Sequence, residues 1–295
     1  MNKRDYVVAT GKLRFKLLAP VWDDLPPALT QGWVDRQLHS DLIFGIQRVR
    51  GLALREYGPI GTQLTGDGRH DQQTDWQSWH ALLQDAEGRV LGCARYRPVS
   101  GGFEQLGASQ SALAHSRTYG PRLRSAIEGQ ISKARNSNVQ YGEVGAWALR
   151  REIRGTAAAV NIALMVFALA EILGGGSAIT TATRLYQSAS ILRRLGGRSL
   201  DGVPAYYEPK YGSVFEILQF DSHRLHPRYT RKLDRLRSEI RRTPVICAAE
   251  SQTKSEPTPA HPNVLRISPR ESGSSSYAMI NRDHRSDFST SETSL

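Results

Sequence analysis

The stretch that decides the fold covers residues 141–195 and reads YGEVGAWALRREIRGTAAAVNIALMVFALAEILGGGSAITTATRLYQSASILRRL. An apolar run over 141–149 predicts a strand, and a charged turn over 150–154 follows it. Gly155, Thr156 and Ala157 then open a nearly uncharged helix that extends to residue 173. A β-rich run at 178–183, a helix ending at Leu195 and a strand at 215–221 continue the alternation. This order predicts an α/β fold.

The turn before the first of these helices is a candidate anion site. Small residues there leave backbone N–H groups unshielded, and the helix dipole adds a partial positive charge. A phosphate is the ligand that such a turn favours. The residues expected to hold it are Arg154, Gly155, Thr156 and Ala157.

The remaining sequence extends the α/β pattern. Apolar spacing predicts helices over 34–56 and near 123–134, and strands at 6–9, 13–18, 79–83 and 90–96, the last two forming a hairpin. A polar, Gly-rich loop is expected over 58–74. We expect an N-terminal arm over 1–27, one domain over 28–245, and a disordered Ser/Thr/Pro-rich tail over 246–295.

The net charge of +11 is concentrated in one segment, 224–242, which alone has a net charge of +6. Apolar residues recur there every three or four positions, so we expect an amphipathic helix with a basic face. The face is either a solvated surface or a site for an acidic protein, an anionic membrane or nucleic acid. Because the segment contains no recognised nucleic-acid motif, nucleic acid ranks last. The basic residues are Arg224, Arg228, Arg231, Lys232, Arg235, Arg237, Arg241 and Arg242.

Composition indicates a cytoplasmic protein without a transmembrane segment. Cys93 and Cys247 form neither a metal pattern nor a disulfide framework, and the N-terminus lacks a secretion signal. The apolar helix at 156–173 is shorter than the span of about 20 residues that a membrane requires. Four polar side chains of one loop could hold a metal or simply face solvent, and we expect no metal: Asp67, His70, Asp71 and Asp75.

Several short motifs resemble the GCN5-related acyltransferase fold. Residues 152–157, EIRGTA, resemble its pyrophosphate-binding turn. Residues 47–50, 75–80 and 88–96, with Glu143-Val144, are similar to motifs of the autoinducer synthases and long-chain N-acyl amino acid synthases within that fold. The resemblance covers roughly 34–221 and implies a mixed, mostly antiparallel sheet with helices on both faces.

The resemblance also implies an N-acyltransferase. The donor would be acyl-CoA or the phosphopantetheine thioester of an acyl carrier protein, the acceptor a small-molecule amine, and N-acyl amino acids candidate products. An acidic carrier protein would dock on the basic segment 224–242. Expected donor-binding residues are Val144, Ala146, Leu149, Arg154, Gly155, Thr156 and Ala157, where N–H groups of the strand stabilise the oxyanion.

Three side chains are expected to take part in the acyl transfer. Glu143 would take the amine proton through water or orient the amine, against the alternative of an ordinary ion pair. Arg95 would bind a carboxylate of an amino acid with two hydrogen bonds, or be a surface arginine. His80 is the third, and its alternative is a buried core histidine.

Three departures from the family pattern bear on function. Glu152 stands where the turn favours Gln or Arg, and Ala146 where autoinducer synthases have arginine, which argues against homoserine lactone chemistry. Leu192 stands where acetyltransferases have a tyrosine that protonates the leaving thiolate. Two alternatives stay open. One is a conventional acetyl-CoA-dependent N-acetyltransferase, which Leu192 counts against, and the other is a non-catalytic acyltransferase-like binding module, which Glu152 and Leu192 favour.

Overall fold

A computed structural model of the protein describes residues 13–21, 25–29, 31–57, 64–185, 187–221 and 225–248. The expected strand at 6–9, Arg224, and the part of the expected tail beyond residue 248 lie outside these residues. The helices are α1 (Arg36–Tyr57), α2 (Gly120–Asn136), α3 (Ala157–Ile172), α4 (Ser188–Leu195) and α5 (Thr230–Arg242). The longer strands are β1 (Arg14–Leu18), β3 (Trp79–Gln84), β4 (Val90–Val99), β5 (Gln140–Leu149), β6 (Gly175–Thr183) and β9 (Ser213–Asp221).

Four short strands complete the sheet: β2 (Gly32–Val34), β7 (Arg198–Ser199), β8 (Tyr206–Glu208) and β10 (Val245–Cys247). The strand order is β2-β10-β1-β3-β4-β5-β6-β9-β7, and β8 also pairs with β9. Parallel pairing joins β1 to β10, β10 to β2, and β5 to β6, whereas the other neighbours described are antiparallel. The prediction of a mixed, mostly antiparallel sheet is confirmed.

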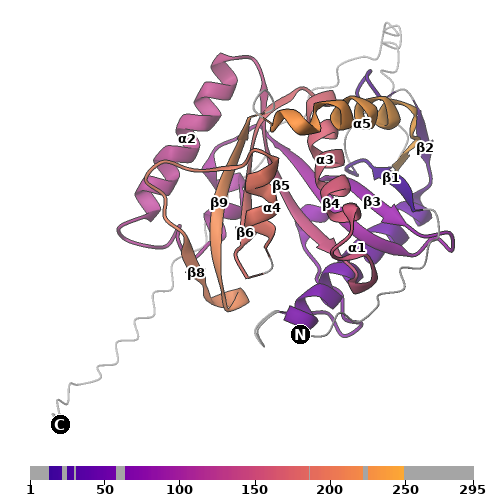
Figure 1. Ribbon diagram of the computed structural model, residues 1–295, viewed down its shortest axis with the longest axis horizontal. Helices are drawn as coiled ribbons and strands as arrows, with labels where there is room; N and C mark the ends of the chain where they lie inside the picture. The colour runs from indigo at the N-terminus through magenta and orange to yellow at the C-terminus, as the bar shows by residue number, and fades with distance from the viewer. Residues whose placement is uncertain are drawn as a thin grey trace, which may run out of the picture. The chain divides into compact units, whose positions relative to one another are not determined.

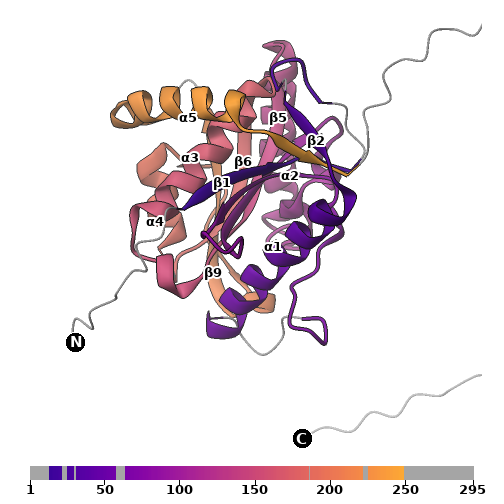
Figure 2. The same cartoon turned by 90° about the vertical axis from the view of Figure 1, so that its right-hand side faces the viewer.

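Helices cover both faces of the sheet (Figures 1 and 2). Successive side chains of a strand point to opposite faces of the sheet, so their contacts show which helices cover each face. On β4, Cys93 packs with Ile43 and Ile46 of α1, whereas the adjacent Ala94 joins the cluster that contains α3. Cluster membership places α2 on the same side as α1, and α4 and α5 on the side of α3.

Helix α3 is the central element of its layer. Eleven of its sixteen residues are buried, which explains why it is apolar all round and Ala-rich. It packs on the sheet on one side and against α5 on the other. No helix among the described residues is long and apolar enough to cross a membrane.

The basic helix begins later than the spacing predicts, at Thr230 instead of residue 224. Pro227 explains the difference, because a proline disfavours helical geometry in the preceding residue and permits only a short 3-10 turn here, Pro227–Tyr229. The sheet also extends past the range 28–245. Strand β1 lies within the expected arm, and Ile246 and Cys247 of β10 belong to the core.

Candidate active site

Strands β5 and β6 pair over only part of their length. Their parallel ladder joins residues 140–143 to residues 175–179 and then stops. Beyond it, β5 continues to Leu149 paired only with β4, and β6 continues to Thr183 paired only with β9. Over 144–149, β5 therefore has a free side without a neighbouring strand among the described residues. The C=O groups of Ala146 and Leu149 already accept hydrogen bonds from Cys93 and Arg154, so this side offers a ligand only its remaining N–H and C=O groups.

A bulge at Ala146 accompanies this separation. The register with β4 runs from Arg95–Gly145 to Cys93–Ala148, so β5 has one residue more than its partner. Ala146 takes the extra position in the left-handed region, with φ of 52°, and its C=O accepts a hydrogen bond from the Cys93 thiol at 3.3 Å. A bulge bends a strand and locally disrupts its ladder, and here it falls within the segment of β5 that has lost its pairing with β6.

The turn from β5 into α3 is built as an N-terminal cap. Gly155 has φ of 73°, and a Cβ added there would meet no atom within 4 Å, so the backbone angle alone favours glycine. Thr156 is the N-cap: its hydroxyl accepts a hydrogen bond from the N–H of Ala158 at 3.1 Å and donates one to the C=O of Ile153 at 2.7 Å. Gly155 and Ala157 are exposed, so the turn is open to a ligand.

Charged side chains stabilise this turn through hydrogen bonds and ion pairs. Arg154 donates from Nε to the C=O of Leu149 at 2.8 Å and from Nη1 to Glu56 of α1 at 2.6 Å. Glu152, the acidic departure from the family pattern, lies 2.8 Å from Nε of Arg150. Its charge is therefore compensated locally, which reduces its repulsion of a phosphate.

A buried ionic cluster lies on the α1 face. Asp75 has no exposed surface and receives two hydrogen bonds from Arg50 of α1, at 2.6 and 2.5 Å. Arg95 of β4 approaches the same carboxylate at 3.1 Å. Burial alone would raise the pKa of Asp75, but the hydrogen bonds and charge of Arg50 outweigh it and hold the pKa below its usual range.

His80 lies against this cluster and is fully buried. Its Nε2–H donates to the backbone carbonyl of Asp75 at 2.8 Å. Burial lowers its pKa to about 4, so the ring is neutral near pH 7. His80 thus has the environment of a core histidine, and it orients the backbone that carries Asp75.

Glu143 is also held by partners. One carboxylate oxygen lies 2.9 Å from Nη2 of Arg97, its register partner on β4, and the other accepts the N–H of Gly107 at 2.9 Å. The side chain is 6% exposed. The structure therefore places Glu143 in an ion pair, two residues before Gly145, which is opposite Arg95.

The predicted site residues fall into two adjoining groups. Val144, Ala146 and Leu149 belong to the free segment of β5 that leads into the turn at Arg154–Ala157, while Arg95, His80 and Glu143 lie on the face of α1 and α2. Sequence reasoning missed Arg97 and Gly107, and it named Arg50 only as part of the motif at 47–50 without a role. The spacing of Arg50 within α1 was the available signal, since it falls on the buried face of that helix.

Two of the loop carboxylates considered as metal ligands pair with arginines instead. Asp75 pairs with Arg50, and Asp67 pairs with Arg69 at 2.7 Å. Within the described ranges, no group of three or more His, Cys, Asp or Glu side chains could hold a metal ion.

Comparisons with known proteins find solved structures of limited similarity and no related sequence. No family model matches the sequence, and no curated protein is significantly similar to it. Among solved structures, a CoA-dependent acyl-homoserine lactone synthase, BjaI, is similar with 13% identity and a TM-score of 0.48, covering 80% of this chain and 93% of its own. The acyl-homoserine lactone synthase LasI has 12% identity and a TM-score of 0.45, covering 71% of this chain and 90% of its own.

FeeM, an N-acyl amino acid synthase from uncultured soil microbes, has 11% identity and a TM-score of 0.45, covering 72% of this chain and 93% of its own. Similarities at identities of 11–13% and TM-scores of 0.45–0.48 leave the substrates of this chain open.

Proposed function

We propose that this protein transfers an acyl group from a pantetheine thioester to an amine. The observation that carries the proposal is the free segment of β5, which bulges at Ala146 and runs directly into the capped turn before α3. An extended ligand that contains amides can pair with such a strand as an added neighbour. A phosphate at its far end would then reach the N–H groups at the start of α3.

The reaction needs a neutral amine next to the thioester. The amine nitrogen attacks the carbonyl carbon, the C–N bond forms, and the C–S bond breaks as the thiolate leaves. Backbone N–H groups near the bulge would stabilise the negative charge on the carbonyl oxygen. The proton lost by nitrogen reaches the thiolate through water, since Leu192 is a buried core residue and offers no hydroxyl.

The environments of the two cysteines favour direct transfer of the acyl group from the thioester to the amine. Burial raises the pKa of Cys93 to about 12, so its thiol stays protonated and is a poor nucleophile. Burial also raises the pKa of Cys247, which lies in β10 at the far part of the sheet. An acyl-enzyme intermediate on either thiol is therefore disfavoured.

We assign Glu143, Arg95 and His80 to the acceptor side. Glu143 is held by Arg97 and by the N–H of Gly107, so its role is to orient the amine. Arg95 is the anion-binding group, and His80 supports the loop of Asp75, which in turn fixes Arg95. N-acyl amino acids are the products that this arrangement favours.

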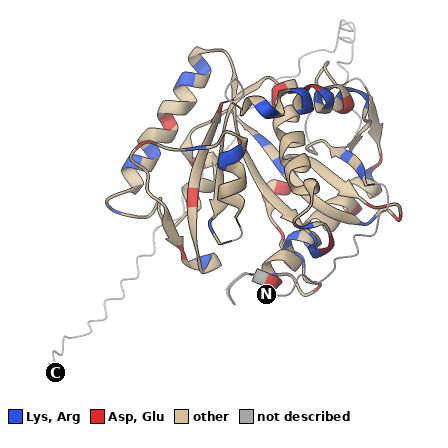
Figure 3. Cartoon of the chain, in the orientation of Figure 1, with Lys and Arg blue, Asp and Glu red and all other residues tan. Residues whose placement is uncertain are grey.

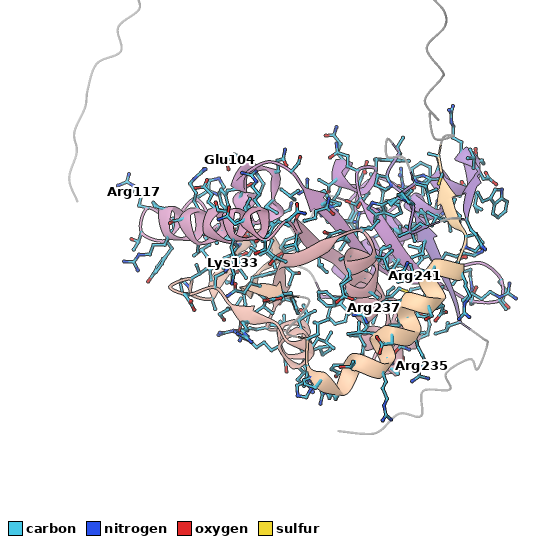
Figure 4. The ribbon with its side chains drawn as sticks, turned by 90° about the horizontal axis from the view of Figure 1, so that it is seen from above. Glu104, Arg117, Lys133, Arg235, Arg237 and Arg241 are labelled. Atoms are coloured by element: carbon cyan, nitrogen blue, oxygen red, sulfur yellow. The ribbon has the colours of Figure 1, made fainter. Side chains whose placement is uncertain are left out.

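For the donor, the surface of α5 favours an acyl carrier protein over free acyl-CoA. Leu233, Leu236 and Ile240 are buried against the core, which turns the basic side of the helix outward. Figure 3 shows basic residues along α5, and Figure 4 labels Arg235 and Arg241 on it. The exposed basic residues of this surface, here called the α5 basic face, are Arg228, Arg231, Arg235, Arg241 and Arg242.

The first experiment is thiol release from three donors: a long-chain acyl carrier protein, a long-chain acyl-CoA and acetyl-CoA, each with mixed amino acids. Products are identified by mass spectrometry. A long-chain N-acyl amino acid supports the proposal, whereas acetylated products alone support a conventional acetyltransferase. If no donor reacts and calorimetry detects no donor binding, the protein is a binding module.

A matched pair of variants tests the turn. Gly155→Asp and Gly155→Asn have similar shape, and both residue types tolerate positive φ better than most. We expect the added negative charge of Gly155→Asp to weaken CoA binding about tenfold or more relative to Gly155→Asn. Equal affinities of the two variants would place the phosphate elsewhere.

A further inference from the structure

A second concentration of positive charge lies at α4. This helix packs beside β9, and basic residues lie on it (Figures 1 and 3). An open pocket of about 410 Å³ is found here, within the range of about 300–1,000 Å³ that small-molecule sites occupy. We call it the α4 pocket, and its lining residues are Arg184, Ala189, Ser190, Arg193, Arg194 and Glu216. None of them belongs to the free segment of β5 or to the turn before α3.

One buried carboxylate orients two of the arginines. Glu216 of β9 is 7% exposed and accepts hydrogen bonds from Nε of Arg184 at 2.5 Å and from Nε of Arg193 at 2.9 Å. Arg193 also donates from Nη2 to the hydroxyl of Ser199 at 2.5 Å. Burial alone would raise the pKa of Glu216, but its hydrogen bonds with the two arginines outweigh burial and hold the pKa below its usual range. Glu216 is therefore ionised near pH 7 and fixes both guanidinium groups.

Positive charge is in excess at the α4 pocket. Three arginines against one glutamate leave a net charge of +2. Arg194 makes no hydrogen bond or ion pair with the described residues, and Arg184 makes such contacts only through Nε. Arginines in the last turn of a helix also stabilise the helix dipole, but Arg184 follows β6 and lies outside α4. Guanidinium groups from two elements thus converge on one pocket with nitrogen atoms left for a ligand.

Exposed apolar side chains lie next to these arginines. Leu185 is 62% exposed, Tyr207 of β8 is 59% exposed and Val214 of β9 is 37% exposed. The N–H of Arg184 donates to the C=O of Val214 at 2.9 Å, and Tyr207 is the register partner of Val214. Because Val214 and Glu216 are two positions apart in one strand, their side chains share a face of the sheet. The α4 pocket therefore adjoins an apolar surface.

From these contacts we infer that the α4 pocket binds a phosphate monoester attached to an apolar or aromatic group. A phosphate dianion would balance the net charge, and its oxygens match the planar donors of arginine. The attached group would lie on the surface that includes Tyr207. Two sources share this chemistry, a free phosphorylated metabolite and the 3′-phosphate of CoA, and only the second rests on the proposed acyl transfer.

The test compares AMP with adenosine by calorimetry on the full chain at 0.1 M salt. The two probes share the base and the ribose and differ in the phosphate. We expect AMP to bind more tightly by about tenfold or more, as charge-assisted hydrogen bonds allow. Arg194→Gln should lower this ratio of affinities by about fivefold or more. Its fold should be preserved, because Arg194 is exposed and has no partner among the described residues.

The matched control is Arg198→Gln, which removes the same charge four positions further along the chain. Arg198 of β7 is the register partner of Gln219, whose side chain points to the face of β9 opposite that of Glu216. This variant should keep the wild-type ratio, because 0.1 M salt screens exposed charges over about 10 Å.

A second pair of probes, CoA and dephospho-CoA, distinguishes the two sources, since these compounds differ only in the 3′-phosphate. A preference for CoA that Arg194→Gln removes assigns the α4 pocket to the donor. Equal binding of both coenzymes, with the preference for AMP intact, assigns it to a separate metabolite. Equal binding within both pairs of probes, or preferences that Arg194→Gln leaves unchanged, would overturn the inference. Absence of transfer from every donor would instead overturn the proposed function and leave the AMP comparison unaffected.

Discussion

At the scale of single residues, the candidate site combines strain with buried polarity. Ala146 holds a left-handed backbone angle that costs a non-glycine residue about 1–2 kcal/mol. Gly145 before it and Ala148 after it are paired with β4, and the Cys93 thiol donates to its carbonyl, so the surrounding sheet maintains the angle. Such strain is typical of functional sites, and here it lies one residue from Gly145.

His80 predicts an acid-sensitive fold. Its folded pKa of about 4 lies below the ordinary value of 6.5, so below pH 6.5 the unfolded protein binds a proton that the folded protein refuses. The stability from neutral His80 is complete above pH 6.5 and is lost as the pH falls toward 4. Between pH 7 and pH 5 the loss amounts to about 2 kcal/mol from this residue.

Urea unfolding of the wild type and of His80→Gln at both pH values measures the effect. Glutamine cannot titrate but can still donate to the C=O of Asp75, so its free energy of unfolding should fall by about 2 kcal/mol less than that of the wild type. His39 and His70, whose pKa values are also lowered by burial, titrate in both proteins and cancel. The same pH dependence in both proteins would contradict the assignment.

At the scale of elements, the turn between β5 and α3 joins the two parts of the candidate donor site. The positive φ of Gly155 reverses the backbone, and Thr156 caps the helix that follows. The start of α3 therefore has a defined position relative to the free segment of β5. A ligand that spans both would meet strand N–H groups first and helix N–H groups afterwards.

Thr156→Ala should lower the free energy of unfolding by about 1 kcal/mol, because the N–H of Ala158 loses its acceptor. Thr156→Ser keeps the hydroxyl and should remain within a few tenths of a kcal/mol of the wild type. Urea unfolding monitored by circular dichroism gives both values. If serine destabilises as much as alanine, the methyl packing of Thr156 matters and the cap does not.

At the scale of the whole molecule, the distribution of charge is the main feature. The net charge is +11 in total, and α5 presents its basic face on the outer side of the α3 layer. Arg237 is tied to Glu171 of α3 and to Asp234, so it anchors the helix and does not belong to the α5 basic face. Charges so arranged attract an acidic partner over a distance that salt shortens, about 10 Å at 0.1 M.

Charge reversal by Arg231→Glu with Arg235→Glu should reduce kcat/KM for an acyl carrier protein donor by about tenfold at low salt, since it removes electrostatic steering. The same variant should leave kcat/KM for acyl-CoA within about twofold, because a free thioester bound at the turn before α3 brings no acidic protein surface to the α5 basic face. The control is Lys133→Glu, which changes a residue of α2 far from α5; Figure 4 labels Lys133. Equal losses with both donors would exclude α5 as a carrier-protein site.

The long elements could be predicted from sequence because their patterns are local. The apolar periods of α1 and α3 and the runs of β3, β4, β5 and β9 each repeat over several residues. The two- and three-residue strands β2, β7, β8 and β10 could not, since so few residues carry no period. Their existence depends on the edges that the longer strands present to them.

The sequence by itself determined the alternation of elements, the glycine–threonine turn before α3 and the amphipathic character of the basic helix, all set by neighbours within a few positions. Only the tertiary structure decided which polar groups meet. Arg50 and Arg95 lie 25 and 20 positions from Asp75, and the packing of α1 against the sheet brings both to one carboxylate. The bulge at Ala146 likewise follows from a mismatch between two strands, which no single segment contains. Pairing register and burial are properties of segments in contact, and for that reason the site is formed by the fold.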